Sequence, residues 1–133
     1  MKGDPRTMQS LTDYRDIVAE VVGYFRVRTA QLRERGVRRI IVDPGFGFAK
    51  TLDQNYELLR GLHRLAELGY PVLAGVSRKS MIYKLLDTTP AEALNGTTAL
   101  HWECLRQGAA ILRVHDTREA VEVVRLFDRF TQV

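Results

Sequence analysis

The sequence has a single cysteine, only four prolines among 133 residues, and no long hydrophobic run. Cys104 alone cannot form a disulfide within the chain, and no group of Cys and His residues has the spacing of a zinc site. No apolar stretch approaches the roughly 18 residues that cross a bilayer. The opening residues 1–5 contain no apolar core of a signal peptide. We therefore expect no membrane partner and a cytoplasmic location.

The chain carries only slightly more positive than negative charge. The formal net charge is +4, and arginines are interleaved with glutamates, without the aromatic residues that accompany nucleic-acid binding. This pattern favours an ordinary solvated surface over a nucleic-acid partner, and it would suit a small anionic substrate. The length fits one domain and falls short of the roughly 250 residues of a closed eight-unit α/β barrel.

Three segments of the chain share one pattern. Each begins as a short, β-branched apolar run and ends in charged and glycine residues, and the three are roughly 35 residues apart, about the length of a βα unit. They are residues 40–50, 71–80 and 109–116. The apolar runs predict strands over residues 40–42, 72–74 and 110–114. This rhythm predicts an α/β fold with a parallel sheet.

Amphipathic stretches between these segments predict helices. They cover about residues 13–35, 51–69, 96–107 and the stretch that follows residue 116. Thr51 and Gln54 have the spacing of a capping box, and Asp116 with Glu119 repeats that spacing as the predicted N-cap of the last helix. The predicted order is one helix followed by three strand–helix units.

The three strand ends carry residues that could bind or react with a ligand. Asp43 is followed by a loop with Gly45 and Gly47, which could present a carboxylate to a heterocycle or could simply form a turn. Ser77, Arg78 and Lys79 could surround an anion or belong to an exposed surface.

Arg113 and His115 are the most informative pair. Strand alternation sends both side chains to the same face at the carboxyl end of the last strand, where two potential cations would point into one pocket. His63, His101, Trp102 and Cys104 fall within predicted helices, where packing or surface roles are more common than catalysis. The three strand ends together predict an anion site, and the loops after the last two strands of α/β barrels often bind phosphate.

The motifs resemble one family, dihydropteroate synthase. Four stretches match the family's motifs in order and spacing: residues 43–50 (DPGFGFAK), 75–80 (GVSRKS), 95–99 (NGTTA) and 113–116 (RVHD). The resemblance implies that residues 1–133 are a single partial domain, with about the sixth to eighth strands of a (β/α)₈ TIM barrel and their helices. It also implies that the amino-terminal half of the barrel is absent from this chain.

By that resemblance, the full enzyme condenses p-aminobenzoate with 6-hydroxymethyl-7,8-dihydropterin diphosphate, giving 7,8-dihydropteroate and diphosphate in folate biosynthesis. Arg113 and His115 match the family's anion-pocket pair and would act in catalysis. The resemblance assigns substrate binding to the same pair and to Asp43, Gly47, Phe48, Ser77, Arg78 and Lys79. The chain alone is expected to be inactive, because half of the pocket lies elsewhere.

The resemblance also implies a cofactor and partners. Mg²⁺ would serve the full-length enzyme through a ligand outside this chain, so no metal ligand is assigned here. We expect a homodimer or self-association through the open barrel edges. Two alternatives stay open: a pterin-binding methyltransferase domain of related fold, and a non-enzymatic phosphate-binding module.

Overall fold

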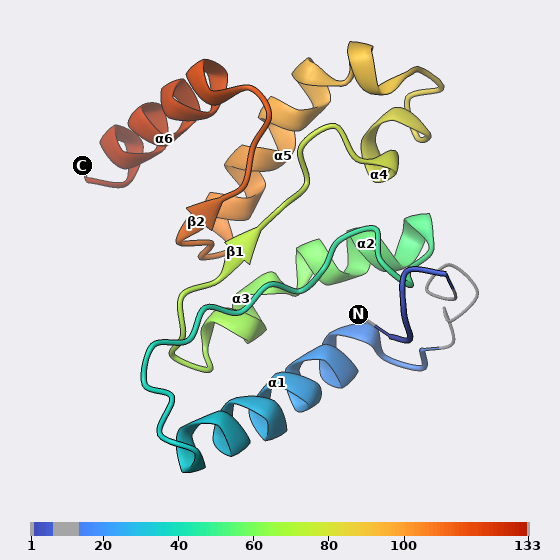
Figure 1. Cartoon of the computed structure of the whole chain (residues 1–133). Helices are drawn as coiled ribbons and strands as arrows, with labels where there is room; N and C mark the ends of the chain where they lie inside the picture. Colours follow the sequence, from blue (N-terminus) through green and yellow to red (C-terminus); the bar gives the residue numbers. More distant parts are fainter. Residues whose placement is uncertain (1, 7–13, 133) are drawn as a thin grey trace.

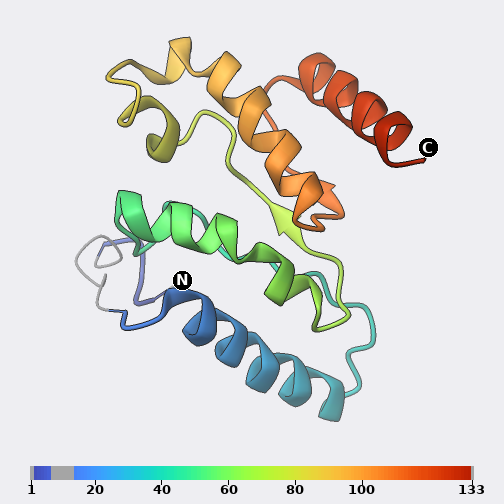
Figure 2. The ribbon, with the colours of Figure 1, turned by 180° about the vertical axis from the view of Figure 1, so that it is seen from behind.

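The computed structural model describes residues 2–6 and 14–132, with helices arranged along one side of a short parallel sheet. In Figure 1 the helices in the middle of the molecule lie behind the strand segments, and in Figure 2, seen from the other side, they lie in front. The elements in chain order are α1 (Ile17–Glu34), α2 (Leu52–Arg60), α3 (Leu62–Ala66), β1 (Leu73–Ala74), α4 (Ser80–Tyr83), the 3₁₀ helix η2 (Pro90–Glu92), α5 (Leu94–Arg106), β2 (Ile111–Leu112) and α6 (Thr117–Thr131).

The sheet is parallel, as the sequence predicts. β1 pairs with β2 in the register Leu73↔Ile111 and Ala74↔Leu112. The predicted strand over residues 40–42 is reduced to one parallel bridge, Val42↔Val72. Among the described residues this segment has a strand neighbour on one side only, so few ladder hydrogen bonds can form. The order across the sheet is therefore the Val42 segment, β1 and β2.

The first helix is close to its prediction. α1 begins at Ile17, where the Asp16 carboxylate caps the helix by accepting a hydrogen bond from the Ala19 N–H at 3.0 Å. It ends before Gly36, whose φ of 87° suits only glycine. The predicted start at Asp13 lies outside the described residues.

The second predicted helix is interrupted, which the sequence analysis did not foresee. Its capping box is confirmed, since Thr51 Oγ1 accepts from the Gln54 N–H at 3.2 Å and Gln54 Oε1 accepts from the Thr51 N–H at 2.9 Å. The helix divides at Gly61 into α2 and α3. A Cβ at Gly61 would lie 2.7 Å from Val18 Cγ2, so glycine allows α1 to pack closely there.

The last helix begins as predicted but without the predicted side-chain cap. Asp116 occupies the N-cap position of α6, yet its carboxylate makes no capping hydrogen bond and instead contacts Arg78. The Arg78 guanidinium binds both carboxylate oxygens, so the prediction of a capping box was wrong for this physical reason.

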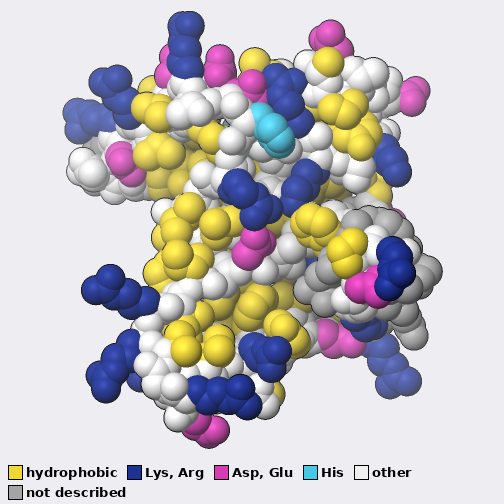
Figure 3. Space-filling view, in the orientation of Figure 1, with side chains coloured by type: hydrophobic (Ala, Val, Ile, Leu, Met, Phe, Trp, Pro, Cys, Tyr) yellow, Lys and Arg dark blue, Asp and Glu magenta, His cyan; other side chains and the backbone are white. Residues whose placement is uncertain are grey.

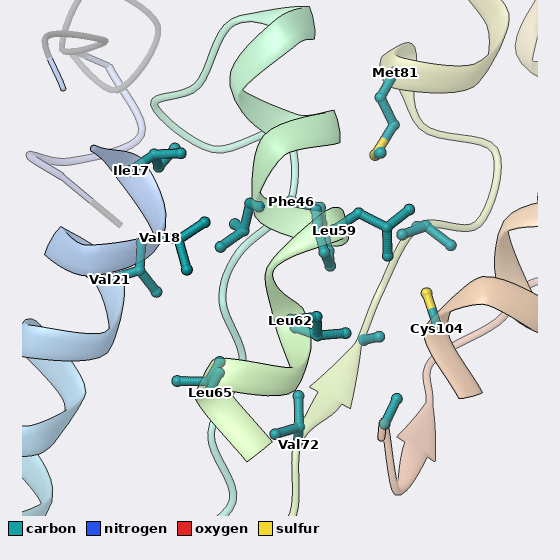
Figure 4. Close-up of a cluster of buried hydrophobic side chains, with 14 of the residues drawn as sticks. Ile17, Val18, Val21, Phe46, Leu59, Leu62, Leu65, Val72, Met81 and Cys104 are labelled. Atoms are coloured by element: carbon teal, nitrogen blue, oxygen red, sulfur yellow. The ribbon is translucent and has the colours of Figure 1, made fainter. Parts of the chain in front are cut away.

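The core fills the space between the helices and the inner side of the strands. Figure 4 shows side chains from α1, α2, α3 and β1 pointing toward one another. The buried cluster includes Ile17, Val21, Val42, Phe46, Leu58, Leu62, Leu65, Val72, Val76, Met81 and Cys104. No helix in the described part of the chain is long and apolar enough to cross a bilayer. The core positions the three strand ends on the opposite, uncovered side.

Candidate functional site

The polar side chains of the strand ends gather on the uncovered face of the sheet. The register aligns residue 43 with residue 73, and residue 73 with residue 111, so strand alternation places Asp43, Arg113 and His115 on the same face. Figure 3 shows Lys and Arg side chains around one His and one acidic side chain in the middle of this face. The prediction that Arg113 and His115 share a face agrees with this arrangement.

Asp43 and Arg113 form an ion pair across the sheet. Arg113 Nη1 donates to Asp43 Oδ2 at 3.0 Å, while the other carboxylate oxygen accepts from the Gly45 N–H at 2.9 Å. The Arg113 side chain crosses over Gly75, where a Cβ would lie 2.5 Å from Nη2. Glycine at position 75 is therefore what allows the guanidinium to reach Asp43.

Ser77 and His115 meet at the next point along the same face. His115 Nδ1 lies 2.9 Å from Ser77 Oγ, and the His115 backbone N–H donates to the same oxygen at 3.2 Å. Ser77 is buried, whereas the imidazole is exposed. A serine hydroxyl that accepts from the backbone can donate its own proton to Nδ1, which leaves an N–H on Nε2 to face a ligand.

Lys79 lines a small cavity together with Ser77, Arg113 and His115. Its ammonium donates to the Phe46 carbonyl at 2.6 Å and lies 4.9 Å from the centroid of the Phe48 ring, a cation–π contact. Burial, with the charge of nearby Arg113 as the second cause, lowers the pKa of Lys79 to about 8. The amine therefore remains mostly protonated at pH 7 and adds a positive charge to the site.

Two buried side chains, Lys50 and Asn55, hold the loop after Asp43 through hydrogen bonds to its backbone. Lys50 Nζ donates to the carbonyls of Gly45 and Phe48, each at 2.8 Å. Asn55 Oδ1 accepts from the Gly47 N–H at 2.7 Å. Burial, followed by repulsion from Lys79, lowers the pKa of Lys50 to about 8. These contacts fix the Phe48 ring beside Lys79.

Arg78 is the one predicted site residue that the structure directs elsewhere. Its guanidinium binds both carboxylate oxygens of Asp116, through Nε at 2.8 Å and Nη2 at 2.9 Å. Nη1 donates to the carbonyls of Pro90 and Ala91. The Arg78 bond is also the main cause that lowers the pKa of Asp116. Arg78 thus ties the loop after β1 to η2 and to the start of α6.

Two hollows adjoin the site. A small cavity of about 120 Å³ is lined by Gly75, Ser77, Lys79, Arg113, Val114 and His115. A larger groove of about 620 Å³ lies between α1 and the loop that contains Asp43, Pro44 and Lys50. The small cavity is therefore surrounded by the cationic side chains of the last two strand ends.

The described residues do not offer a metal site. Within residues 2–6 and 14–132, no three His, Cys, Asp or Glu side chains lie close enough together to hold a metal ion. These described residues therefore do not fit a magnesium site.

The remaining candidates within helices have packing surroundings. His101 is 2% exposed, and burial lowers its pKa. Trp102 packs edge-on against Phe127 at a centroid distance of 5.2 Å. Burial raises the pKa of Cys104 to about 12, so its thiol stays protonated. These contacts agree with the structural roles that the sequence favoured.

Three residues matter to the site although the sequence assigned none of them to substrate binding or catalysis. Gly75 lies inside a matched motif, but a single sequence does not show that a side chain at position 75 would displace Arg113. Lys50 stands at the end of the first motif, and a lysine beside a glycine-rich loop was the only signal. Asn55 lies within a helix, four residues after its N-cap, where burial could not be predicted.

The chain matches a known family over most of its length. Residues 1–115 match the family described as pterin binding enzyme. A dihydropteroate synthase of Escherichia coli is 43% identical over 130 residues, which cover 96% of this chain and 46% of that protein. One of Synechocystis is 44% identical over 131 residues, with 45% of that protein covered. The chain spans about half the length of the curated relatives it matches.

Solved structures agree with these relatives. The dihydropteroate synthase of Thermus thermophilus superposes with a TM-score of 0.90 at 39% identity, covering 95% of this chain and 52% of that protein, in a crystal with 4-aminobenzoate. A Yersinia pestis dihydropteroate synthase with a sulfonamide drug gives a TM-score of 0.96 at 35% identity, covering 100% of this chain and 49% of that one. The predicted resemblance and the predicted fold class, a partial α/β barrel with parallel strands, are confirmed.

Proposed function

Since this chain belongs to the family of pterin-binding enzymes, we propose that it forms the carboxyl-terminal half of a dihydropteroate synthase. In this proposal residues 1–133 are one partial domain with about strands six to eight of the barrel. The complete enzyme joins p-aminobenzoate to 6-hydroxymethyl-7,8-dihydropterin diphosphate and releases diphosphate. The chain alone lacks part of the pocket and is inactive.

The convergence of hydrogen-bond donors around the small cavity is the observation that supports this reaction most directly. Arg113, Lys79 and His115 line one cavity, and Asp43 is the acidic group paired with Arg113 there. When diphosphate leaves, the bond between its ester oxygen and the pterin methylene breaks. Negative charge grows on that oxygen while positive charge grows on the methylene. Donors fixed in advance on that oxygen stabilise the transition state more than the ground state. Arg113 and the His115 Nε2–H are placed for that role.

The Asp43–Arg113 pair would open or be shared when substrate binds. Its side chains are 34% and 54% exposed, and a pair this exposed contributes no more than about 1 kcal/mol. A pterin with N–H groups could therefore replace Arg113 at Asp43 Oδ2 at little cost, and the released guanidinium could bind the diphosphate. Asp43 Oδ1 keeps its bond to the Gly45 N–H, so the carboxylate stays oriented.

The aminobenzoate side is assigned to the loop and to the residues beside Lys79. Phe48 and Ser77 would hold the ring and the carboxylate of the aminobenzoate, and Gly47 allows close approach of the backbone. Lys79 would contact the polar atoms of the pterin ring and pack along it. The crystal of the Thermus thermophilus relative with 4-aminobenzoate supports this substrate class. Arg78 uses its donors within the protein, so in our proposal it shapes the site through the loop that carries Lys79 and does not bind the anion.

Three further expectations, about the metal, the assembly and the location, belong to the same proposal. They are a Mg²⁺-assisted reaction with the metal held outside this chain, a homodimer or self-association through open barrel edges, and a cytoplasmic location. The methyltransferase alternative receives less support, because the relatives and structures reported above are named as synthases.

The test is to complete the barrel. This chain would be joined to the part of the E. coli relative that it does not match, and formation of dihydropteroate would be measured with both substrates. We expect activity from the joined protein, none from either part alone, and loss of at least about a hundredfold in kcat/KM for Arg113→Met. The matched control is Arg60→Met, on the exposed side of α2. Activity equal to the parent in Arg113→Met would refute the assigned anion site.

A further inference from the structure

The loop from Gly45 to Ala49 has one backbone hydrogen bond of its own, from the Phe48 N–H to the Gly45 carbonyl at 3.1 Å. Gly45, Gly47 and Ala49 have φ values of 73°, 88° and 54°. Glycine adopts this left-handed region freely, but Ala49 does so at a cost of order 1 kcal/mol. Ala49 therefore persists in this conformation only where the surroundings fix it.

Two buried side chains supply that fixation. Lys50 bridges the carbonyls of Gly45 and Phe48 with one ammonium, and so ties the two ends of the loop together. Asn55 holds the Gly47 N–H in the middle, and its own Nδ2 donates to the Thr51 carbonyl at 2.9 Å. Lys50 is 6% exposed and Asn55 is 2% exposed, so neither contact competes with bulk water.

Global stability does not explain a lysine at position 50. Its ammonium is buried, and it takes part in none of the ion pairs found among residues 2–6 and 14–132. Burying a charge in this way disfavours folding, and a methionine of similar volume would fill the same space without that cost. The lowered pKa agrees with the cost. What the ammonium does provide is a fixed distance between two loop carbonyls.

The loop in turn fixes groups of the proposed substrate pocket. The Phe46 carbonyl accepts from Lys79 Nζ, and the Phe48 ring lies against the same ammonium. Gly47 is so close to Lys79 that a Cβ there would lie 3.7 Å from its Cδ. A shift of this loop would therefore move the Phe48 ring and free the Lys79 ammonium together.

We propose that Lys50 and Asn55 are positioning residues, which set the Phe48 ring at the arylamine side of the pocket and hold Lys79 beside it, without touching substrate. This proposal rests on the function proposed above. It predicts that removing either side chain loosens the loop, weakens arylamine binding and leaves the anion pair Arg113 and His115 in place.

The first test uses the chain as it is, with hydrogen exchange at single amides. Lys50→Met should speed exchange at the Gly47 and Phe48 amides by about tenfold or more, with the amides of α5 unchanged. The melting temperature should fall by only a few degrees, because the Gly45 and Phe48 carbonyls lose one donor while a buried charge is removed. Asn55→Leu should likewise speed exchange at Gly47, whereas Asn55→Asp keeps an acceptor oxygen and should retain most of the protection. Lys84→Met, at an exposed lysine, is the matched control.

Two results of this test would overturn the proposal. One is unchanged exchange at Gly47 and Phe48 in Lys50→Met. The other is a rise at all amides together with a melting temperature lowered by more than a few degrees, which would show that Lys50 only stabilises the fold.

The second test uses the joined protein described above. Lys50→Met should raise the KM for p-aminobenzoate by about tenfold, with kcat and the KM for the pterin diphosphate each within about threefold of the parent. A loss confined to kcat, or an equal loss in Lys84→Met, would contradict the proposal. An inactive parent protein would count against the proposed function alone, because the exchange measurement decides the positioning role independently.

Discussion

Two arginines, Arg78 and Arg113, lie at neighbouring strand ends and differ in what they bind. Arg78 is 22% exposed and makes four hydrogen bonds, two of them to the carboxylate of Asp116. Arg113 is 54% exposed and makes one ion pair, to Asp43. The comparison shows that one arginine at a strand end can stabilise the fold through internal hydrogen bonds. Another, more exposed arginine can exchange its partner for a ligand.

Gly61 and Gly75 also differ in role, since one serves packing of the fold and the other serves the functional site. Gly61 allows a close contact between core elements, because its missing Cβ would meet three atoms of Val18 within 3.3 Å. Gly75 leaves room for the far end of a flexible side chain, the Arg113 guanidinium. A side chain at position 61 would therefore strain the fold, whereas one at position 75 would move only the functional group.

Replacing Arg78 should cost the most stability. Arg78→Met leaves the Asp116 carboxylate and the carbonyls of Pro90 and Ala91 without their donors, and we expect the melting temperature to fall by roughly 10 °C. Thermal unfolding followed by circular dichroism checks this, with Arg60→Met as the exposed control. A melting temperature equal to that of the control would remove the distinction between the two arginines.

The buried lysines predict how stability depends on pH. The folded pKa of Lys50 is about 8 against an ordinary value of 10.5, so between these values the unfolded chain holds more protons. The free energy of unfolding should therefore rise with pH over this window, by up to about 1.4 kcal/mol per pH unit for one lysine. Urea unfolding at pH 8, 9 and 10 measures it. Lys50→Met should have the smaller slope, and an unchanged slope would mean that Lys50 is not desolvated.

Gly61→Ala should lower stability by about 1 to 3 kcal/mol, because the neighbouring atoms belong to the packed Val18 side chain. Urea unfolding measures this change. Since the substitution lies away from the strand ends, it should leave anion binding by the folded chain unchanged. A variant as stable as the parent would show that α1 can move away from α2 and α3 freely.

Gly75→Ala should have the smallest effect on stability, within about 0.5 kcal/mol. The guanidinium of Arg113 can rotate away from the added methyl group, but it then loses Asp43. We expect this variant to bind inorganic diphosphate more weakly than the parent but more tightly than Arg113→Met, because the displaced guanidinium keeps its charge and loses its fixed position. Full anion affinity in Gly75→Ala would show that the crossing of Arg113 over Gly75 is not required.

The sequence predicted the parallel order of elements and the residues that meet at the strand ends, because strand alternation and the βα rhythm are local patterns. It did not predict which partner each polar group takes. Asp116 has the pattern of an N-cap, and only the approach of Arg78 from 38 residues away redirects its carboxylate. The division at Gly61 and the buried charge of Lys50 also depend on contacts across the fold.

The account depends on one anion site formed by neighbouring strand ends, and titration of the chain with inorganic diphosphate tests it most directly. Chemical-shift changes of the Arg113 and His115 side chains would follow binding. We predict binding in the millimolar range, weakened about tenfold or more in Arg113→Met and unchanged in Arg60→Met. Equal affinity in all three proteins, or shifts confined to residues away from Arg113 and His115, would contradict the account.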